Sequence, residues 1–179
     1  MVDRRGEIID AGLAVIRELG FAGLTQPRVA ARAGLRASHL TYYYPTRADL
    51  LSAIGRSAVD RQLSAVRAMF GGLKSLDHAA VAIAELVTRH DNTRVLLALA
   101  QAGDQAPEIR IMFCELADGI ATEIDAFLTR VTDRPPAAHA ARMLHAASVG
   151  LAVVTLATGR ADGQEGVARM LRDLLTAVS

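Results

Sequence analysis

Side chains that can hydrogen-bond to another molecule gather in one short stretch near the start of the chain. Arg36, Ser38 and His39 follow a turn predicted around Gly34, and all three carry hydrogen-bonding groups. Leu40 is expected to face inward, which leaves a short and polar outer half on this predicted helix. Such a face is typical of a helix that reads base edges in the DNA major groove.

Two predicted helices must position these side chains. Thr25 is a good N-cap for the first of them. Ala30 lies opposite Gly34 in the turn, so the next helix can cross closely, and a Cβ at Gly34 would resist the positive φ that such turns often need. Pro45 ends the second helix because it disfavours helical backbone in the residue before it. Residues 25–44 therefore predict a helix-turn-helix.

Further helices are predicted on both sides of this motif. A helix over residues 4–19 is expected to stop at Gly20, a favoured residue just beyond a helix end. A fourth helix is expected to begin at Thr46, where Asp49 completes a variant of the capping box. It extends toward Phe70 and can connect the N-terminal head rigidly to the rest of the chain.

Composition and charge favour a globular protein with a basic head. The chain has 179 residues, of which 51% are hydrophobic and 22% are charged, so it is expected to fold around a core. The first 56 residues hold eight arginines against five acidic residues, a net charge of +3, and the remainder carries −2. Positive charge confined to one region is expected where phosphates are met. Cys114 is the only cysteine, and no apolar leader is apparent, so a cytoplasmic protein is expected.

Several short motifs occur together between residues 4 and 54. They are Gly20-Phe21, Thr25, Val29-Ala30 with Gly34-Leu35, Leu40 with Tyr43-Tyr44-Pro45, and Thr46-Arg47 with Leu50-Leu51. In this combination the segment resembles the N-terminal domain of the TetR family of transcriptional regulators. The resemblance implies a ligand-responsive, sequence-specific DNA-binding regulator, most often a repressor released from its operator by a small-molecule effector. It also implies an all-α fold of about nine helices, with a three-helix head in residues 1–56 and a ligand-binding and dimerisation trunk in residues 57–179.

By position, the resemblance also implies which residues contact DNA. Arg36 could reach a guanine edge with two hydrogen bonds, Ser38 and His39 could bond to base edges, and Ala37 could touch a thymine methyl group. The others are better placed for the backbone phosphates, which fix register rather than sequence. The predicted DNA-binding residues are Thr25, Gln26, Arg28, Arg36, Ala37, Ser38, His39, Thr41, Tyr42, Tyr43 and Arg47.

This chain departs from the family pattern at two of these positions. Many members have tyrosine where Thr41 stands, so that contact is expected to be weaker or supplied by Tyr42, and many have lysine in place of Ala37. These changes affect the operator sequence more than DNA binding itself. Tyr44 is expected in the core. Arg47 opposes the helix dipole, which favours a phosphate partner over a solvated charge.

Helical patterns fill the rest of the chain, over residues 75–89, 93–102, 108–131, 137–158 and 164–178. The last two are expected to pair with a second copy in a four-helix bundle, although packing within one chain is the alternative. A homodimer is favoured because one head reads few base pairs, and a palindromic operator with half-sites roughly 34 to 36 Å apart would engage two heads. The predicted dimer surface comprises Ala141, His145, Ser148, Ala152 and Thr155, with Val167, Met170, Leu171, Leu174 and Leu175.

Two inferences concern apolar residues of the trunk. Residues 143–159 form an apolar stretch that is too short for a membrane span if roughly 20 residues are needed, so a core or interface helix is expected and no membrane partner. The middle helices carry enough apolar residues to line an effector cavity, and an occupant is expected to shift the helix after Thr46. The predicted lining residues are Phe70, Leu86, His90, Met112, Phe113 and Leu116.

Enzymatic chemistry has little support in the sequence. None of the five histidines stands at a helical metal-ligand spacing, and no phosphate-binding loop or Gly-x-Ser-x-Gly motif occurs. Cys114 is expected to be a buried small hydrophobe, with a redox-sensing thiol as a minority alternative. We therefore expect no metal, no cofactor and no enzyme. Two other classes stay open: a small-molecule-binding helical dimer without operator binding, and a helical enzyme that uses the trunk cavity.

Overall fold

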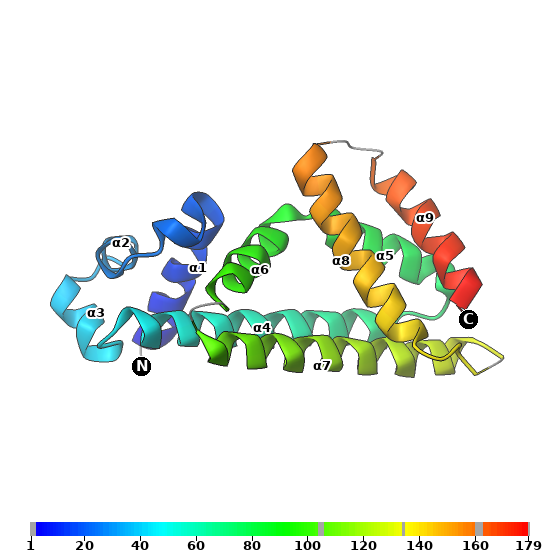
Figure 1. Cartoon of the computed structure of the whole chain (residues 1–179), viewed down its shortest axis with the longest axis horizontal. Coiled ribbons are helices and arrows are strands. Elements are labelled where there is room, and N and C mark those ends of the chain that lie inside the picture. Colours follow the sequence, from blue (N-terminus) through cyan, green and yellow to red (C-terminus); the bar gives the residue numbers. More distant parts are fainter. Residues whose placement is uncertain (1–2, 104–105, 134, 160–162, 179) are drawn as a thin grey trace. The chain divides into compact units, whose positions relative to one another are not determined.

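The structure is a computed structural model that describes residues 3–103, 106–133, 135–159 and 163–178. Within these residues it contains nine α-helices and no strand, which confirms the predicted all-α fold (Figure 1). The helices are α1 (Arg4–Gly23), α2 (Gln26–Arg32), α3 (Ala37–Tyr43), α4 (Arg47–Gly72), α5 (Leu76–Thr88), α6 (His90–Ala102), α7 (Pro107–Val131), α8 (Ala140–Thr158) and α9 (Gly163–Val178).

The helices pack into two compact units. The first combines the residues up to Arg61 with Arg94–Cys114, and the second combines Gln62–Thr93 with the residues from Glu115 onward. The packing of Arg94–Cys114 with the N-terminal helices has no counterpart in the sequence analysis. The boundary between residues 56 and 57 concerns function and stays a prediction.

Glycine allows close helix packing in the first unit. A Cβ at Gly12 of α1 would lie 2.3 Å from Cδ1 of Ile54 on α4, and a Cβ at Gly55 would lie 2.7 Å from Cδ1 of Ile109 on α7. Ile54 and Ile109 are both buried, so neither has free space to move into. These contacts hold α1 and the first turn of α7 against the start of α4.

The predicted stop at Gly20 is a kink. Gly20 has φ 69° and ψ −174°, a backbone conformation open essentially to glycine alone, and helical turns resume after it as far as Gly23. The sequence signal therefore located the break correctly, but the expected helix end over residues 4–19 was too early.

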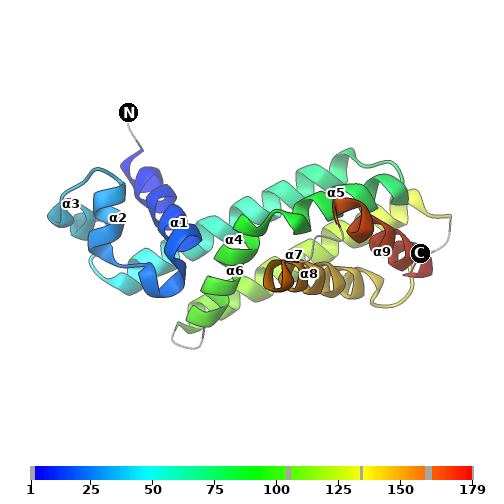
Figure 2. The same cartoon turned by 90° about the horizontal axis from the view of Figure 1, so that it is seen from above.

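In the second unit, α5 packs against α8 and α9 (Figure 2). Its inner face carries small residues, Ala79, Ala80 and Ala84, all fully buried, and α9 contributes Leu171 and Leu175, also fully buried. Small side chains at a helix contact shorten the distance between the helix axes. The alanine-rich composition of the chain is thus used to bring α5 close to its neighbours.

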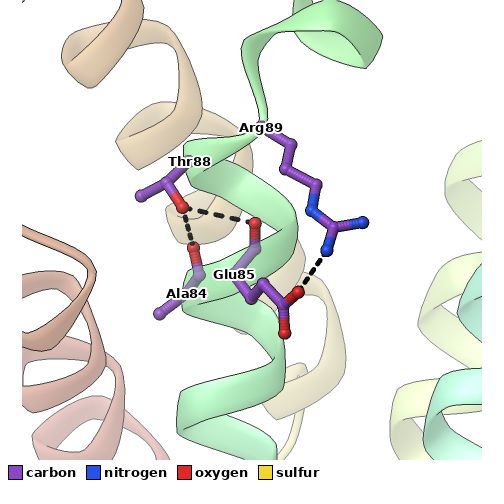
Figure 3. Close-up of polar contacts among 4 residues, drawn as sticks. All are labelled: Ala84, Glu85, Thr88 and Arg89. Atoms are coloured by element: carbon purple, nitrogen blue, oxygen red, sulfur yellow. Dashed lines mark hydrogen bonds and ion pairs between the residues drawn. The ribbon is translucent and has the colours of Figure 1, made fainter.

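The junction of α5 and α6 is a single residue (Figure 3). Thr88 donates its hydroxyl to the carbonyl oxygen of Ala84 at 2.8 Å, and Arg89 pairs with Glu85 one turn back. Arg89 alone leaves helical geometry, with φ −84° and ψ 92°. Because these side chains close the end of α5 within one residue, α6 begins at His90, and the prediction of a start at residue 93 was wrong.

Helix α8 is longer than the apolar stretch seen in the sequence. It begins after His139, which has a left-handed φ of 68°, and it contains 19 residues. Within the described residues it is the one helix long and apolar enough to cross a membrane by length and composition alone. The expectation that this segment is too short therefore does not hold. Only 22% of the apolar window is buried, which leaves much of the helix uncovered.

The predicted small-residue surface of α8 was placed on the wrong face. Ala141 and Ala152 are buried within the chain, and the hydroxyls of Ser148 and Thr155 donate to carbonyl oxygens four residues earlier, both at 2.8 Å. His145 is half-buried. The large exposed apolar side chains are instead Met143, Val149 and Val154.

Two further residue predictions need correction. On α9, Val167, Leu171 and Leu175 are buried within the chain, which leaves Met170 as the large exposed apolar residue of that helix. Cys114 of α7 is exposed and is not a core residue. The apolar run around it was misleading because α7 buries Met112 and Leu116, which lie on another face of the helix.

Candidate nucleic-acid interface

The outer face of α3 is polar and exposed. Arg36, Ser38 and His39 lie on it, while Leu40 is completely buried and fastens the helix to the first unit. Arg36 is the N-cap residue, and its side chain makes no capping bond. Its guanidinium is therefore not used to hold the start of the helix. The predicted exposure is confirmed, and it extends to Ala37, Thr41 and Tyr42.

Local signals set the start of α2 and the turn that follows it. The hydroxyl oxygen of Thr25 accepts a hydrogen bond from the amide of Arg28 at 3.4 Å, as expected of an N-cap. Gly34 has φ 67°, and a Cβ there would meet no atom within 4 Å. The turn thus needs glycine for its backbone conformation and not for room. The amide of Leu35 closes the turn on the carbonyl of Ala30 at 2.9 Å.

A reciprocal capping box starts α4. The amide of Thr46 donates to Oδ2 of Asp49 at 2.9 Å, and the amide of Asp49 donates to Oγ1 of Thr46 at 3.0 Å. This confirms the predicted motif, with aspartate in the place usually held by glutamate. The amides of Thr46, just before α4, and of Asp49, in its first turn, are thus both satisfied by side chains at the helix start.

Two residues predicted to bind phosphate make hydrogen bonds within the chain. The side-chain amide of Gln26 donates to the carbonyl oxygen of Tyr44 at 2.8 Å. One terminal nitrogen of Arg28 donates to the carbonyl oxygen of Gly23 at 3.3 Å. Gln26 is half-buried and Arg28 is exposed. The Arg28 guanidinium retains donors for another partner, whereas the Gln26 amide has one N–H left.

Arg47 joins the start of α4 to the end of α1. Its Nε donates to the carbonyl oxygen of Leu24 at 3.1 Å, and its guanidinium carbon lies 4.8 Å from the ring centre of Phe21. The residue as a whole is exposed. The alternatives expected for Arg47 were a phosphate partner and a solvated charge, and the structure adds a hydrogen bond and a cation–π contact within the chain.

The three consecutive tyrosines have separate environments. Tyr44 is buried as predicted, and burial raises the pKa of its phenol. Tyr42 is 81% exposed and Tyr43 is half-buried, with their rings edge to face at 5.3 Å between centres. Thr41 donates its hydroxyl to the carbonyl of Ala37 at 2.9 Å, so its proton is already used. Tyr42 is thus better placed than Thr41 for a contact with another molecule.

An ion pair between α1 and α2 was missed by sequence reasoning. Two nitrogens of Arg32 bond to the two carboxylate oxygens of Glu18 at 2.7 and 2.6 Å. The hydrogen bond to Glu18 raises the pKa of Arg32 above its ordinary value. The partners are 14 residues apart, and no local pattern links them. Arg32 therefore contributes to the packing of α2 against α1.

The six predicted effector residues divide between the two units: Met112 and Phe113 belong to the first, and Phe70, Leu86, His90 and Leu116 to the second. Phe70 is buried against Phe127, with 5.2 Å between ring centres. Nδ1 of His90 is buried and makes no hydrogen bond within the described part of the chain. No group of three or more potential metal-ligating side chains occurs there either.

The head matches a known protein family. Residues 8–54 match the bacterial regulatory proteins of the tetR family, and this range contains α2, α3 and the capped start of α4. This match confirms, for the head, the resemblance drawn from the motifs between residues 4 and 54.

Individual relatives extend the similarity of this chain beyond its head. The transcriptional regulator BetI of Cronobacter sakazakii is 30% identical over 99 residues, a match that covers 55% of this chain and about half, 49%, of that relative. A TetR family member from Streptomyces coelicolor A3 is 29% identical with a TM-score of 0.72, covering 97% of this chain and 98% of that structure. The multidrug binding protein EbrR, complexed with imidazole, is 28% identical with a TM-score of 0.71, covering 97% and 96%.

Proposed function

We propose that this chain is a homodimeric, ligand-responsive regulator of transcription that binds a palindromic DNA operator, acting in the cytoplasm as a repressor. The observation that carries the proposal is the outer face of α3, which is polar and exposed on a helix whose one core side chain, Leu40, is fully buried. The match of residues 8–54 to the tetR family and the similarity to BetI, named as a transcriptional regulator, support it.

The proposed DNA contacts fall into two groups. Arg36, Ser38 and His39 lie where they would meet base edges, with Ala37 beside a thymine methyl group. Arg28, Tyr42 and Tyr43 would meet phosphates, together with the terminal nitrogens of Arg47 and with Thr25 at the start of α2. The first group would set the sequence that is read and the second how firmly it is held.

The proposed second copy covers α8. Met143, Val149 and Val154 expose large apolar side chains on this helix, and Met170 does so on α9. A Cβ at Gly150 would meet no atom within 4 Å, which leaves room for another helix to approach closely. An apolar face of this kind is expected to be covered in a protein that works in water. Two heads would then read two half-sites.

The proposed effector is a mostly apolar molecule with one hydrogen-bonding group. Within the second unit the apolar candidates are Phe70, Leu86 and Leu116, and the buried, unbonded Nδ1 of His90 supports a polar contact. EbrR, a structural relative, is named as a multidrug binding protein and was crystallised with imidazole. Effector binding would shift the start of α4 and oppose DNA binding by a coupling free energy of about 1 to 3 kcal/mol.

Selection of bound sequences from random duplex DNA tests the proposal. We expect enrichment of a palindrome and an affinity that falls steeply with salt, by a slope of about −0.9 per phosphate contact. Tyr43→Phe combined with Arg47→Ala should flatten that slope. Arg89→Ala, which removes an exposed arginine at the end of α5, is the matched control and should leave it unchanged.

Failure to enrich any sequence, with binding insensitive to salt, would contradict the proposal. That result would favour the small-molecule-binding dimer without operator recognition. Association of the purified chain with lipid vesicles in place of self-association would instead show that the apolar face of α8 meets a membrane.

A further inference from the structure

A hydrogen bond from Gln26 links the first residue of α2 to the residue that ends α3. Its side-chain amide donates to the carbonyl oxygen of Tyr44 at 2.8 Å, in a partly buried position. The two residues are 18 apart in sequence. The contact therefore joins both ends of the helix-turn-helix, and it is the longest-range hydrogen bond that the structure gives to a side chain of α2.

The carbonyl of Tyr44 needs such a donor. The last carbonyls of a helix have no amide partner within it, and Tyr44 has left helical geometry, with φ −135° and ψ 88°. The Gln26 amide thus satisfies a carbonyl that the end of α3 leaves without a partner in its own helix.

Tyr44 is held at three points. Its ring is buried, its amide donates to the carbonyl of Leu40 at 2.8 Å, and its carbonyl accepts from Gln26. Leu40 is itself completely buried. The end of α3 is therefore tied to the core by side chains and to α2 by a hydrogen bond, while the start of α3 at Arg36 has no side-chain cap.

We propose that Gln26 is a positioning residue that sets the orientation of α3 for base reading and is not a phosphate contact. The inference rests on the proposed DNA-binding function. It replaces the role predicted for Gln26 from the family resemblance. The bond exists in the chain without DNA, so its contribution precedes binding, whereas a phosphate contact contributes only in the complex.

The two roles differ in what they do to specificity. A phosphate contact acts on every DNA sequence alike, so its loss weakens binding to the operator and to unrelated duplex equally. A residue that orients α3 acts through Arg36, Ser38 and His39, which contact bases. Its loss therefore lowers the ratio of operator affinity to affinity for unrelated duplex.

The full-length chain carrying Gln26→Met tests this, because methionine keeps the length of the side chain and removes both hydrogen-bonding groups. We expect the affinity ratio to fall about tenfold, the scale of one hydrogen bond lost from a partly buried carbonyl. Amide hydrogen exchange of α3 in the chain without DNA should also become faster. Gln101→Met, which changes an exposed glutamine on α6, is the control and should alter neither quantity.

A second variant protects the test against a folding defect. Gln26→Glu keeps the side-chain length and places a carboxylate at a helix N-terminus, which favours α2, yet it removes the donor to Tyr44. It should reproduce both effects of Gln26→Met. The added negative charge weakens binding to all duplexes, so the affinity ratio is again the quantity to compare.

Equal losses on both duplexes, with hydrogen exchange of α3 unchanged, would overturn the proposal and return Gln26 to phosphate binding. If the unmodified chain prefers no duplex, the proposed function itself fails. The exchange measurement then still decides whether Gln26 holds α3, because it needs no DNA.

Discussion

The outer faces of α3 and α8 are both exposed, but they present opposite chemistry. On α3 the face carries Arg36, Ser38 and His39. On α8 it carries valine and methionine side chains, and the hydroxyls of Ser148 and Thr155 are turned to carbonyl oxygens of their own helix. One face thus offers hydrogen bonds to a partner and the other offers almost none.

This difference separates the kinds of partner that the two faces can accept. A polar face gains from partners that replace its water hydrogen bonds with directed ones, such as base edges. An apolar face gains from exclusion of water, which requires a complementary apolar surface. The same chain therefore combines a surface suited to nucleic acid with one suited to a second copy of itself.

The largest effect is expected from charge on the apolar face. Val149→Asp combined with Val154→Asp should raise the dimer dissociation constant by about 100-fold or more, because a carboxylate buried without a partner costs several kcal/mol. Sedimentation over a range of concentrations measures this. Val81→Asp, at an exposed valine of α5, is the control. An unchanged dimer would show that α8 is not the interface.

The matching change on the polar face is Arg36→Ala. Loss of a bidentate contact to guanine should reduce discrimination at one base pair by about 1 to 3 kcal/mol, with little effect on self-association. Competition between operator variants measures it. Arg17→Ala, an exposed arginine on α1, serves as the control. Equal weakening on every variant would mean that Arg36 binds phosphate.

A smaller effect is expected from the turn that presents α3. Gly34→Ala forces a Cβ onto a residue with φ 67°, which should lower the free energy of unfolding by about 1 to 2 kcal/mol. Gly71→Ala, where the helical backbone is open and no atom lies near the added Cβ, should instead raise it by up to about 1 kcal/mol. Urea unfolding compares the two. Similar effects at both sites would argue against backbone strain.

The smallest effect concerns pH and α8. Burial lowers the pKa of His145 below its ordinary value of 6.5, so the unfolded chain binds the extra proton more readily. Stability from this group is present above pH 6.5 and is lost as pH falls toward the folded pKa, with a slope of at most about 1.36 kcal/mol per pH unit. We measure the free energy of unfolding across this pH range. Its dependence on pH should become flatter in His145→Gln but not in His78→Gln, which changes an exposed histidine.

Local sequence signals predicted the head well. Thr25, Gly34 and the pair Thr46 and Asp49 act within four residues of the backbone groups that they serve, so residue type and spacing suffice to identify them. The predicted capping and turn roles of these residues were also correct. The exception is the close helix crossing expected at Gly34, where glycine is needed only for its positive φ. The family resemblance added the set of exposed residues on α3.

Contacts between distant residues could not be predicted in the same way. Gln26 bonds to Tyr44, Glu18 to Arg32 and Arg47 to Leu24, over 14 to 23 residues. From the sequence alone, every polar side chain on the surface of a helix could be free to contact another molecule. Which of them are used internally depends on the angles at which the helices cross.

The sequence by itself determined the caps and turns of the head at Thr25, Gly34 and Thr46, because capping and turn preferences act over a few residues. It also determined that the outer face of α3 is polar. Only the tertiary structure decided which face of α8 is exposed. That helix is apolar on nearly all sides, so its periodicity does not distinguish an inner from an outer face. Packing against α5 and α9 made the choice by burying Ala141, Leu144 and Ala152 and leaving Val149 and Val154 uncovered.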